Sequence, residues 1–94
     1  MNLDTLVRTS PNQVSCELQG EEVILNLQSG VYYGLDIVGA VIWRLIEQPR
    51  TIASIRDAML EEFEVDAERC QKDLFVLLDK LSQEGLIEIV EGAQ

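Results

Sequence analysis

The stretch GVYYGLDIVGAVIW, residues 30–43, passes from a strand pattern to a helix pattern without a loop between them. Residues 31–35 alternate between two faces, as a β-strand does. Asp36 then supplies a suitable N-cap, and the apolar residues after it follow helical spacing. The adjacent Tyr32 and Tyr33 therefore lie on an expected strand, pointing to opposite faces, immediately before a helix.

Two alternating segments precede this stretch and predict a three-stranded antiparallel meander with it. Residues 13–19 and 22–28 alternate between apolar and polar side chains, and Gly20-Glu21 and Ser29-Gly30 supply tight turns. We expect the apolar phase of the two strands to face the core. Its members are Val14, Cys16, Leu18, Val23, Leu25 and Leu27, with Ile24 as an exception on the outer face.

Three helices are expected after the sheet. The first stops near Gln48, because Pro49 disfavours a helical residue before it. Thr51 caps the second helix, and the third runs from Asp66 to about Glu84, where a glycine follows. Three strands followed by three helices, joined by short turns, predict an α+β fold of the winged-helix-like kind.

The 94 residues allow one domain with a small core. Residues 1–12 lack periodicity, so we expect a flexible N-terminal arm, a folded domain over 13–90 and a C-terminal tail over 91–94. No apolar run reaches the roughly 18 residues that span a bilayer, and the start does not resemble a signal peptide. A cytoplasmic location is the expectation.

The charge balance argues against nucleic acid and anionic membranes as partners. Seven basic residues against 17 acidic ones give a formal net charge of −10, which repels phosphate. In a DNA-binding winged helix the last helix carries basic residues on its outer face. The expected third helix instead holds three basic and five acidic residues, so a peptide is the more suitable partner.

The chain has no histidine, and its two cysteines do not have a metal-type spacing. The commonest general base near neutral pH is therefore missing, as is the commonest metal ligand. We expect Cys16 and Cys70 to be buried free thiols. The sequence predicts a protein that is not an enzyme and that holds no metal and no cofactor.

Two stretches carry a resemblance to a known family. Residues 24–52, ILNLQSGVYYGLDIVGAVIWRLIEQPRTI, are followed by an acidic helix that ends in LDKLSQEGLI. This pattern resembles the PqqD-like proteins, the recognition elements that bind leader segments of ribosomally made, enzymatically modified peptides. The similarity spans roughly residues 14–90. The YYGLD stretch resembles most the stand-alone leader-binding proteins of lasso peptide biosynthesis.

The resemblance implies a non-catalytic function and several partners. A leader peptide would add as an extended strand to the third strand of the sheet and lie beside the third helix. The protein would then present the precursor to a leader-removing cysteine protease and an ATP-dependent cyclase. Leaders of this class commonly carry a Tyr-x-x-Pro-x-Leu pattern. Alternatives are a recognition protein for another modifying enzyme, a DNA-binding winged-helix regulator, and a small enzyme.

The expected peptide-binding residues lie on the third strand and on the outer side of the third helix. The third strand is expected at a free sheet edge, which would accept a leader or a second copy of the chain. Of the two tyrosines, Tyr33 is in phase with the core residues, so Tyr32 is favoured for peptide contact. Arg69 and Asp73 have the alternative of a simple surface ion pair. The full set is Val31, Tyr32, Tyr33, Gly34, Leu35, Arg69, Asp73, Val76, Leu77 and Lys80.

Overall fold

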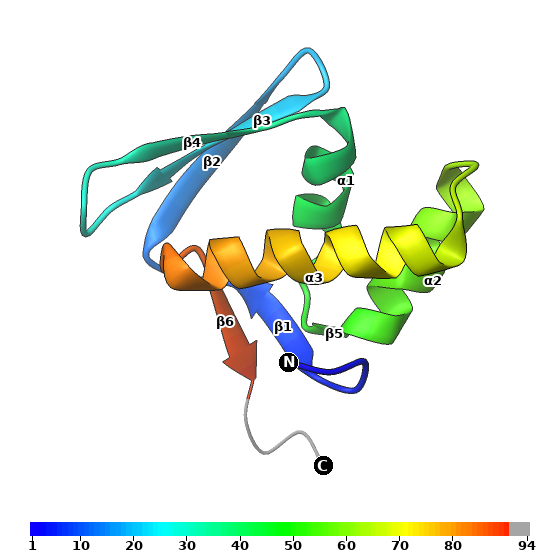
Figure 1. The fold of residues 1–94 in the computed structure, drawn as a ribbon. Helices are drawn as coiled ribbons and strands as arrows, with labels where there is room; N and C mark the ends of the chain where they lie inside the picture. The colour runs from blue at the N-terminus through cyan, green and yellow to red at the C-terminus, as the bar shows by residue number, and fades with distance from the viewer. Residues whose placement is uncertain (91–94) are drawn as a thin grey trace.

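Two small antiparallel sheets and three helices make up residues 1–90, the part of the chain that the structure, a computed structural model, describes (Figure 1). The expected C-terminal tail, 91–94, lies outside the described residues. The elements follow in the order β1 Leu6–Thr9, β2 Gln13–Leu18, β3 Glu21–Asn26, β4 Tyr32–Leu35, α1 Ile37–Leu45, β5 Arg50–Thr51, α2 Ile52–Glu62, α3 Ala67–Gln83 and β6 Ile87–Val90.

The predicted meander is confirmed as one of the two sheets. Its strand order is β2-β3-β4, with both pairs antiparallel. The strand β4 pairs only with β3, so its other edge is free of backbone partners within the described residues. The α+β class is confirmed, and the short β4–α1 junction places this free edge beside the helices (Figure 1).

The second sheet corrects the prediction of a flexible N-terminal arm over residues 1–12. Residues 6–9 form β1, the central strand of a sheet ordered β5-β1-β6. Val7 is fully buried there, and Leu6 pairs with both Thr51 and Val90. A four-residue strand is too short to show periodicity in the sequence. Its partners lie far along the chain, so no local pattern indicates the pairing.

The predicted inward face of β2 and β3 is also wrong. Ile24 is 0% exposed and belongs to the core, whereas Val14 and Leu18 are 53% and 59% exposed. Cys16, on the same face as Val14, is exposed too, so the prediction that it is buried is wrong. The reason is that α1 packs against the face that contains Ile24, although Ile24 is the only apolar side chain that β2 and β3 place on that face.

Contacts between the sheet and α1 fix this orientation. Trp43 is almost fully buried, and its indole Nε1 donates a hydrogen bond of 3.1 Å to the Ser15 hydroxyl on β2. On the same face, Arg44 lies 3.5 Å from the carboxylate of Glu17. The odd-numbered residues of β2 therefore face the helix, and the apolar even-numbered residues face outward.

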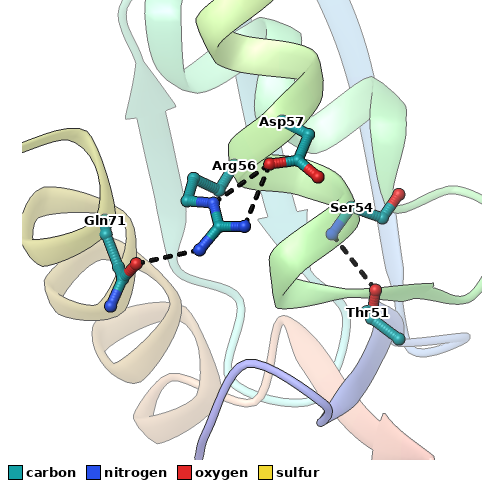
Figure 2. Close-up of polar contacts among 5 residues, drawn as sticks. All are labelled: Thr51, Ser54, Arg56, Asp57 and Gln71. Atoms are coloured by element: carbon teal, nitrogen blue, oxygen red, sulfur yellow. Dashed lines mark hydrogen bonds and ion pairs between the residues drawn. The ribbon is translucent and has the colours of Figure 1, made fainter. Parts of the chain in front are cut away.

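All three predicted helix caps are confirmed. The side chains of Asp36, Thr51 and Asp66 each accept a hydrogen bond from a backbone N–H in the first turn of the following helix. Figure 2 shows the Thr51 cap, whose hydroxyl lies 3.1 Å from the Ser54 nitrogen. The first helix ends at Leu45, slightly earlier than the expected Gln48.

The long helix α3 crosses between the two sheets (Figure 1). It buries Leu74, Leu78 and Leu81 in the core. Arg56 on α2 joins the two helices, because its guanidinium donates a 3.1 Å hydrogen bond to Gln71 on α3 (Figure 2). No helix within residues 1–90 combines the length and the apolar character needed to cross a bilayer.

The orientation of the β2-β3-β4 sheet can be tested by the stability of two variants. Ile24→Ala should lower the free energy of unfolding by about 2–5 kcal/mol, because it opens a cavity in the core. Val14→Ala removes methyl groups from the exposed face and should change it by no more than about 0.5 kcal/mol. Urea unfolding measures both. A larger loss for Val14→Ala would restore the opposite orientation.

Candidate functional site

A groove of about 600 Å³ lies between two walls, the strand β4 with the start of α1 on one side and α3 on the other. Its volume is within the range of sites that bind ligands. In Figure 1, β4 runs above α3, and α1 descends from the end of β4 toward α3. The free edge of β4 thus borders a concave surface.

The floor of the groove is part of the hydrophobic core. Ile42, Met59, Leu74 and Leu81 line it and are each no more than 5% exposed. Aliphatic and thioether groups therefore form the base, with Phe63 at the end nearest α2. Such a floor suits apolar side chains of a ligand, because covering it removes apolar surface from water.

Seven of the ten predicted site residues line the groove. They are Tyr33, Gly34, Leu35, Arg69, Asp73, Leu77 and Lys80. The structure brings the two predicted segments, the third strand and the third helix, to opposite walls of one site. Val31, Tyr32 and Val76 do not line it.

The side chain that faces the groove is that of Tyr33, not the favoured Tyr32. Tyr33 packs against the core and also lines the groove, while Tyr32 is 68% exposed on the opposite face of the sheet. This follows from the sheet orientation, because Tyr33 pairs with the buried Ile24 and shares its face. Tyr33 therefore both packs against the core and lines the groove, whereas the sequence predicts one of these roles for each tyrosine.

The backbone groups of Tyr32 nevertheless point to the free edge of β4, where another strand could pair with them. The Asn26 nitrogen donates a 3.0 Å hydrogen bond to the Val31 carbonyl, which sets the alternation between β3 and β4. In an antiparallel ladder, successive residues direct their N–H and C=O groups alternately toward the partner strand and away from it. Tyr33 therefore bonds toward β3, and the backbone groups of Tyr32 and Gly34 point to the free edge.

Gly34 leaves open space on this strand. A Cβ atom built there would have no neighbouring atom within 4 Å, so the packing of the chain itself does not require glycine. Gly39, by contrast, sits where a Cβ would come within 3.1 Å of Leu35. A side chain at Gly39 would require Leu35 to shift by a few tenths of an ångström.

The outer lip of the groove, along α3, carries charged side chains. Arg69 Nε lies 3.6 Å from Asp73 Oδ2, and both side chains are largely exposed, so the pair contributes only a few tenths of a kcal/mol. Lys80 follows along the same lip. Val76 lies about 20° beyond Arg69 around the helix and is 64% exposed, just outside the groove.

Two ionisable groups of the groove have shifted pKa values. The Tyr33 hydroxyl donates a 2.6 Å hydrogen bond to Glu84 Oε2, and this bond, together with burial and the charge of Glu84, raises the pKa of Tyr33. Burial and the nearby Asp73 carboxylate raise the pKa of the Cys70 thiol, partly opposed by Arg56. The phenol and the thiol both stay protonated at neutral pH.

The sequence reasoning missed three kinds of groove residue. The floor residues and Cys70 follow helical apolar spacing, which predicts core, and the floor residues are part of the core as well. Val38 and Val65 are exposed apolar residues outside the predicted site, and both line the groove. Glu84 has no signal in the sequence, because only the packing of α3 against β4 brings it into the site.

Within residues 1–90, no group of three or more histidine, cysteine, aspartate or glutamate residues is arranged to hold a metal ion. The site is instead a half-open apolar groove beside an unpaired strand edge. This combination is characteristic of proteins that bind an extended peptide by strand addition.

The comparisons with known proteins agree with this class. The family described as "Coenzyme PQQ synthesis protein D (PqqD)" matches residues 21–87. No curated protein matches the chain. A solved structure described as "TbiB1 in Complex with the TbiA(beta) Leader Peptide" is 37% identical, with a TM-score of 0.80 over 93% of this chain and 98% of that one.

A second structure, "Lasso peptide synthetase B1 complexed with the leader peptide", shares the fold. It is 22% identical, with a TM-score of 0.77 over 87% of this chain and 96% of the other. The chain therefore belongs to the PqqD family. The resemblance expected from residues 24–52 is confirmed.

The two cysteines offer a test of the site's geometry. Cys16 is exposed on the outer face of the sheet, whereas Cys70 is partly buried in the groove with a raised pKa. At pH 8, iodoacetamide should modify Cys16 about three- to tenfold faster than Cys70, because alkylation needs an accessible thiolate. Mass spectrometry of the digested protein measures both rates, with Cys16→Ser to isolate Cys70. Equal rates would contradict the placement of Cys70.

Proposed function

We propose that this protein binds the leader segment of a ribosomally made precursor peptide. The observation that carries the proposal is the position of the groove directly alongside the free edge of β4. A peptide strand paired with that edge would bury one of its faces against α3. The 37% identical TbiB1 structure, which holds a leader peptide, supports this function.

The binding mode divides affinity and specificity between backbone and side chains. The outward backbone groups of Tyr32 and Gly34 would pair with the peptide whatever its sequence. Alternate peptide side chains would enter the groove and meet its apolar floor, including Met59 and Leu74. Selection then depends on how well those side chains fill the floor.

The length of the groove fits a short recognition segment. On α3 it is lined from Arg69 to Glu84, which is fifteen residue steps of about 1.5 Å, or about 22 Å. An extended peptide rises about 3.3 Å per residue, so about seven residues span that length. The six-residue Tyr-x-x-Pro-x-Leu pattern expected for lasso leaders has a suitable size.

The proposed role is non-catalytic presentation in the cytoplasm. The bound leader would hold the precursor for a cysteine protease that removes the leader and for an ATP-dependent cyclase that closes the ring. A second candidate is a peptide carrier for another modifying enzyme, and the family's description as a coenzyme PQQ synthesis protein favours it. The edge of β4 would also accept β4 of a second copy, in competition with the leader.

The first test is calorimetric titration with a synthetic leader that carries the Tyr-x-x-Pro-x-Leu pattern. We expect 1:1 binding at micromolar or tighter affinity, and a loss of at least about tenfold when Tyr and Leu are replaced by Ala, since the pockets lose their side chains. Binding that depends on protein concentration would reveal a competing homodimer. No binding to either peptide would favour a different precursor class.

The strand-addition mode has its own test at Tyr32. Tyr32→Pro removes the N–H that points to the free edge, while Tyr32→Ala keeps it and only shortens an exposed side chain. We expect Tyr32→Pro to weaken leader binding about tenfold or more and Tyr32→Ala to change it by less than about threefold. Gly34→Pro should resemble Tyr32→Pro.

Two controls accompany these variants. Glu61→Ala changes an exposed residue of α2 outside the groove and should bind like the unmodified protein. Circular dichroism must show that each proline variant is folded. Equal binding by folded Tyr32→Pro and Tyr32→Ala would exclude strand addition at this edge.

A further inference from the structure

One residue, Glu84, joins the sheet to the end of α3 through two separate hydrogen bonds. Its side-chain Oε2 accepts the Tyr33 hydroxyl of β4 at 2.6 Å. Its backbone carbonyl accepts the side-chain amide of Asn26, at the end of β3, at 2.8 Å. Tyr33 and Glu84 both line the groove, so the first of these bonds connects its two walls.

The bond lies near the N-terminal end of β4, where the Asn26 amide supplies the other hydrogen bond between the hairpin and residue 84. At its C-terminal end, β4 continues into α1, which is packed into the core. At its N-terminal end, β4 follows the exposed turn 27–31 of the β3–β4 hairpin. Within residues 1–90, no other hydrogen bond joins β4 to α3.

The hydrogen bond between Tyr33 and Glu84 is stronger than most side-chain hydrogen bonds. A hydroxyl that donates to a carboxylate at 2.6 Å is a charge-assisted hydrogen bond, which is shorter and stronger than one between neutral groups. The raised pKa of Tyr33 keeps the phenol protonated and able to donate. The bond therefore persists across the neutral pH range.

We propose that Tyr33 and Glu84 are positioning residues that hold β4 at the distance from α3 that an inserted peptide strand requires. This inference rests on the proposed function and deepens it. Without the bond, the hairpin is held to the helix at its α1 end and through Asn26, and only its packing against the core keeps the Tyr33 ring in the groove wall. A ligand would then have to order the strand on binding, which lowers its affinity.

Four variants test the proposal with the same leader titration. Tyr33→Phe and Glu84→Ala each remove the bond and should weaken binding about tenfold. Glu84→Gln retains an oxygen that accepts the phenol and should stay within about threefold of the unmodified protein. The double variant Tyr33→Phe/Glu84→Ala should bind no worse than either single variant, because both remove the same bond.

The matched control is Ser15→Ala. It also removes one side-chain hydrogen bond between the sheet and a helix, here with Trp43, but at a place outside the groove. Glu84→Ala should remain folded, because the Asn26 bond goes to the backbone carbonyl of residue 84. If Ser15→Ala weakens binding as much as Tyr33→Phe, the effect is general destabilisation and the proposal is overturned.

A second measurement needs no peptide. The chain has two tyrosines, so labelling with 3-fluorotyrosine gives two fluorine resonances, one from the exposed Tyr32 and one from Tyr33. Glu84→Ala should move the Tyr33 resonance toward that of Tyr32, and Glu84→Gln should not. An unchanged Tyr33 resonance in Glu84→Ala would overturn the proposal.

The two measurements separate this inference from the proposed function. If the unmodified protein does not bind the leader, the proposed function fails and the role of the bond in binding fails with it. The fluorine spectra still decide in that case whether Glu84 holds the ring of Tyr33. If the unmodified protein binds the leader, and Tyr33→Phe and Glu84→Ala bind it as tightly as the unmodified protein does, only the positioning role is overturned.

Discussion

The burial of Ile24 against α1 decides which face of the β2-β3-β4 sheet meets the rest of the protein. Ile24 has no exposed surface, and Trp43 of α1 packs into the same core and bonds to Ser15 of β2. Side chains alternate along a strand, so one buried position assigns every other position to a face. Tyr33 lies opposite Ile24 and is turned inward, and Tyr32 is turned outward as a consequence.

The groove between β4 and α3 is a continuation of this packing. Its floor consists of residues that already stabilise the fold, such as Ile42 and Leu81, and its walls are β4 and α3. The core is therefore not closed on this side, and a bound peptide would complete it. The site therefore combines an apolar floor with an unpaired strand edge.

Signals that act over a few residues were read correctly from the sequence. Asp36, Thr51 and Asp66 cap the helices as predicted, and the three-stranded meander ends on the predicted edge strand. Seven of the ten predicted site residues line the groove, because the predicted strand and helix form its two walls. Caps and turns depend on neighbouring backbone groups, which the local sequence specifies.

Features that depend on packing between distant parts of the chain were not predicted correctly. The alternation in residues 13–28 places every apolar side chain except Ile24 on one face, and this favours the face that the structure leaves exposed, with Val14 and Leu18 on it. The strand β1 is not predicted from the sequence, because it is short and pairs with segments near residues 50 and 90.

The sequence by itself determined the order of the elements, their caps and turns, the free edge of β4, and membership of the PqqD family. The tertiary structure decided which face of the sheet is buried, that Tyr33 rather than Tyr32 enters the groove, and that Glu84 meets Tyr33 across it. The physical reason is that the alternation along a strand shows which residues share a face, but not which of the two faces another element covers. The packing of α1 against the Ile24 face decides that.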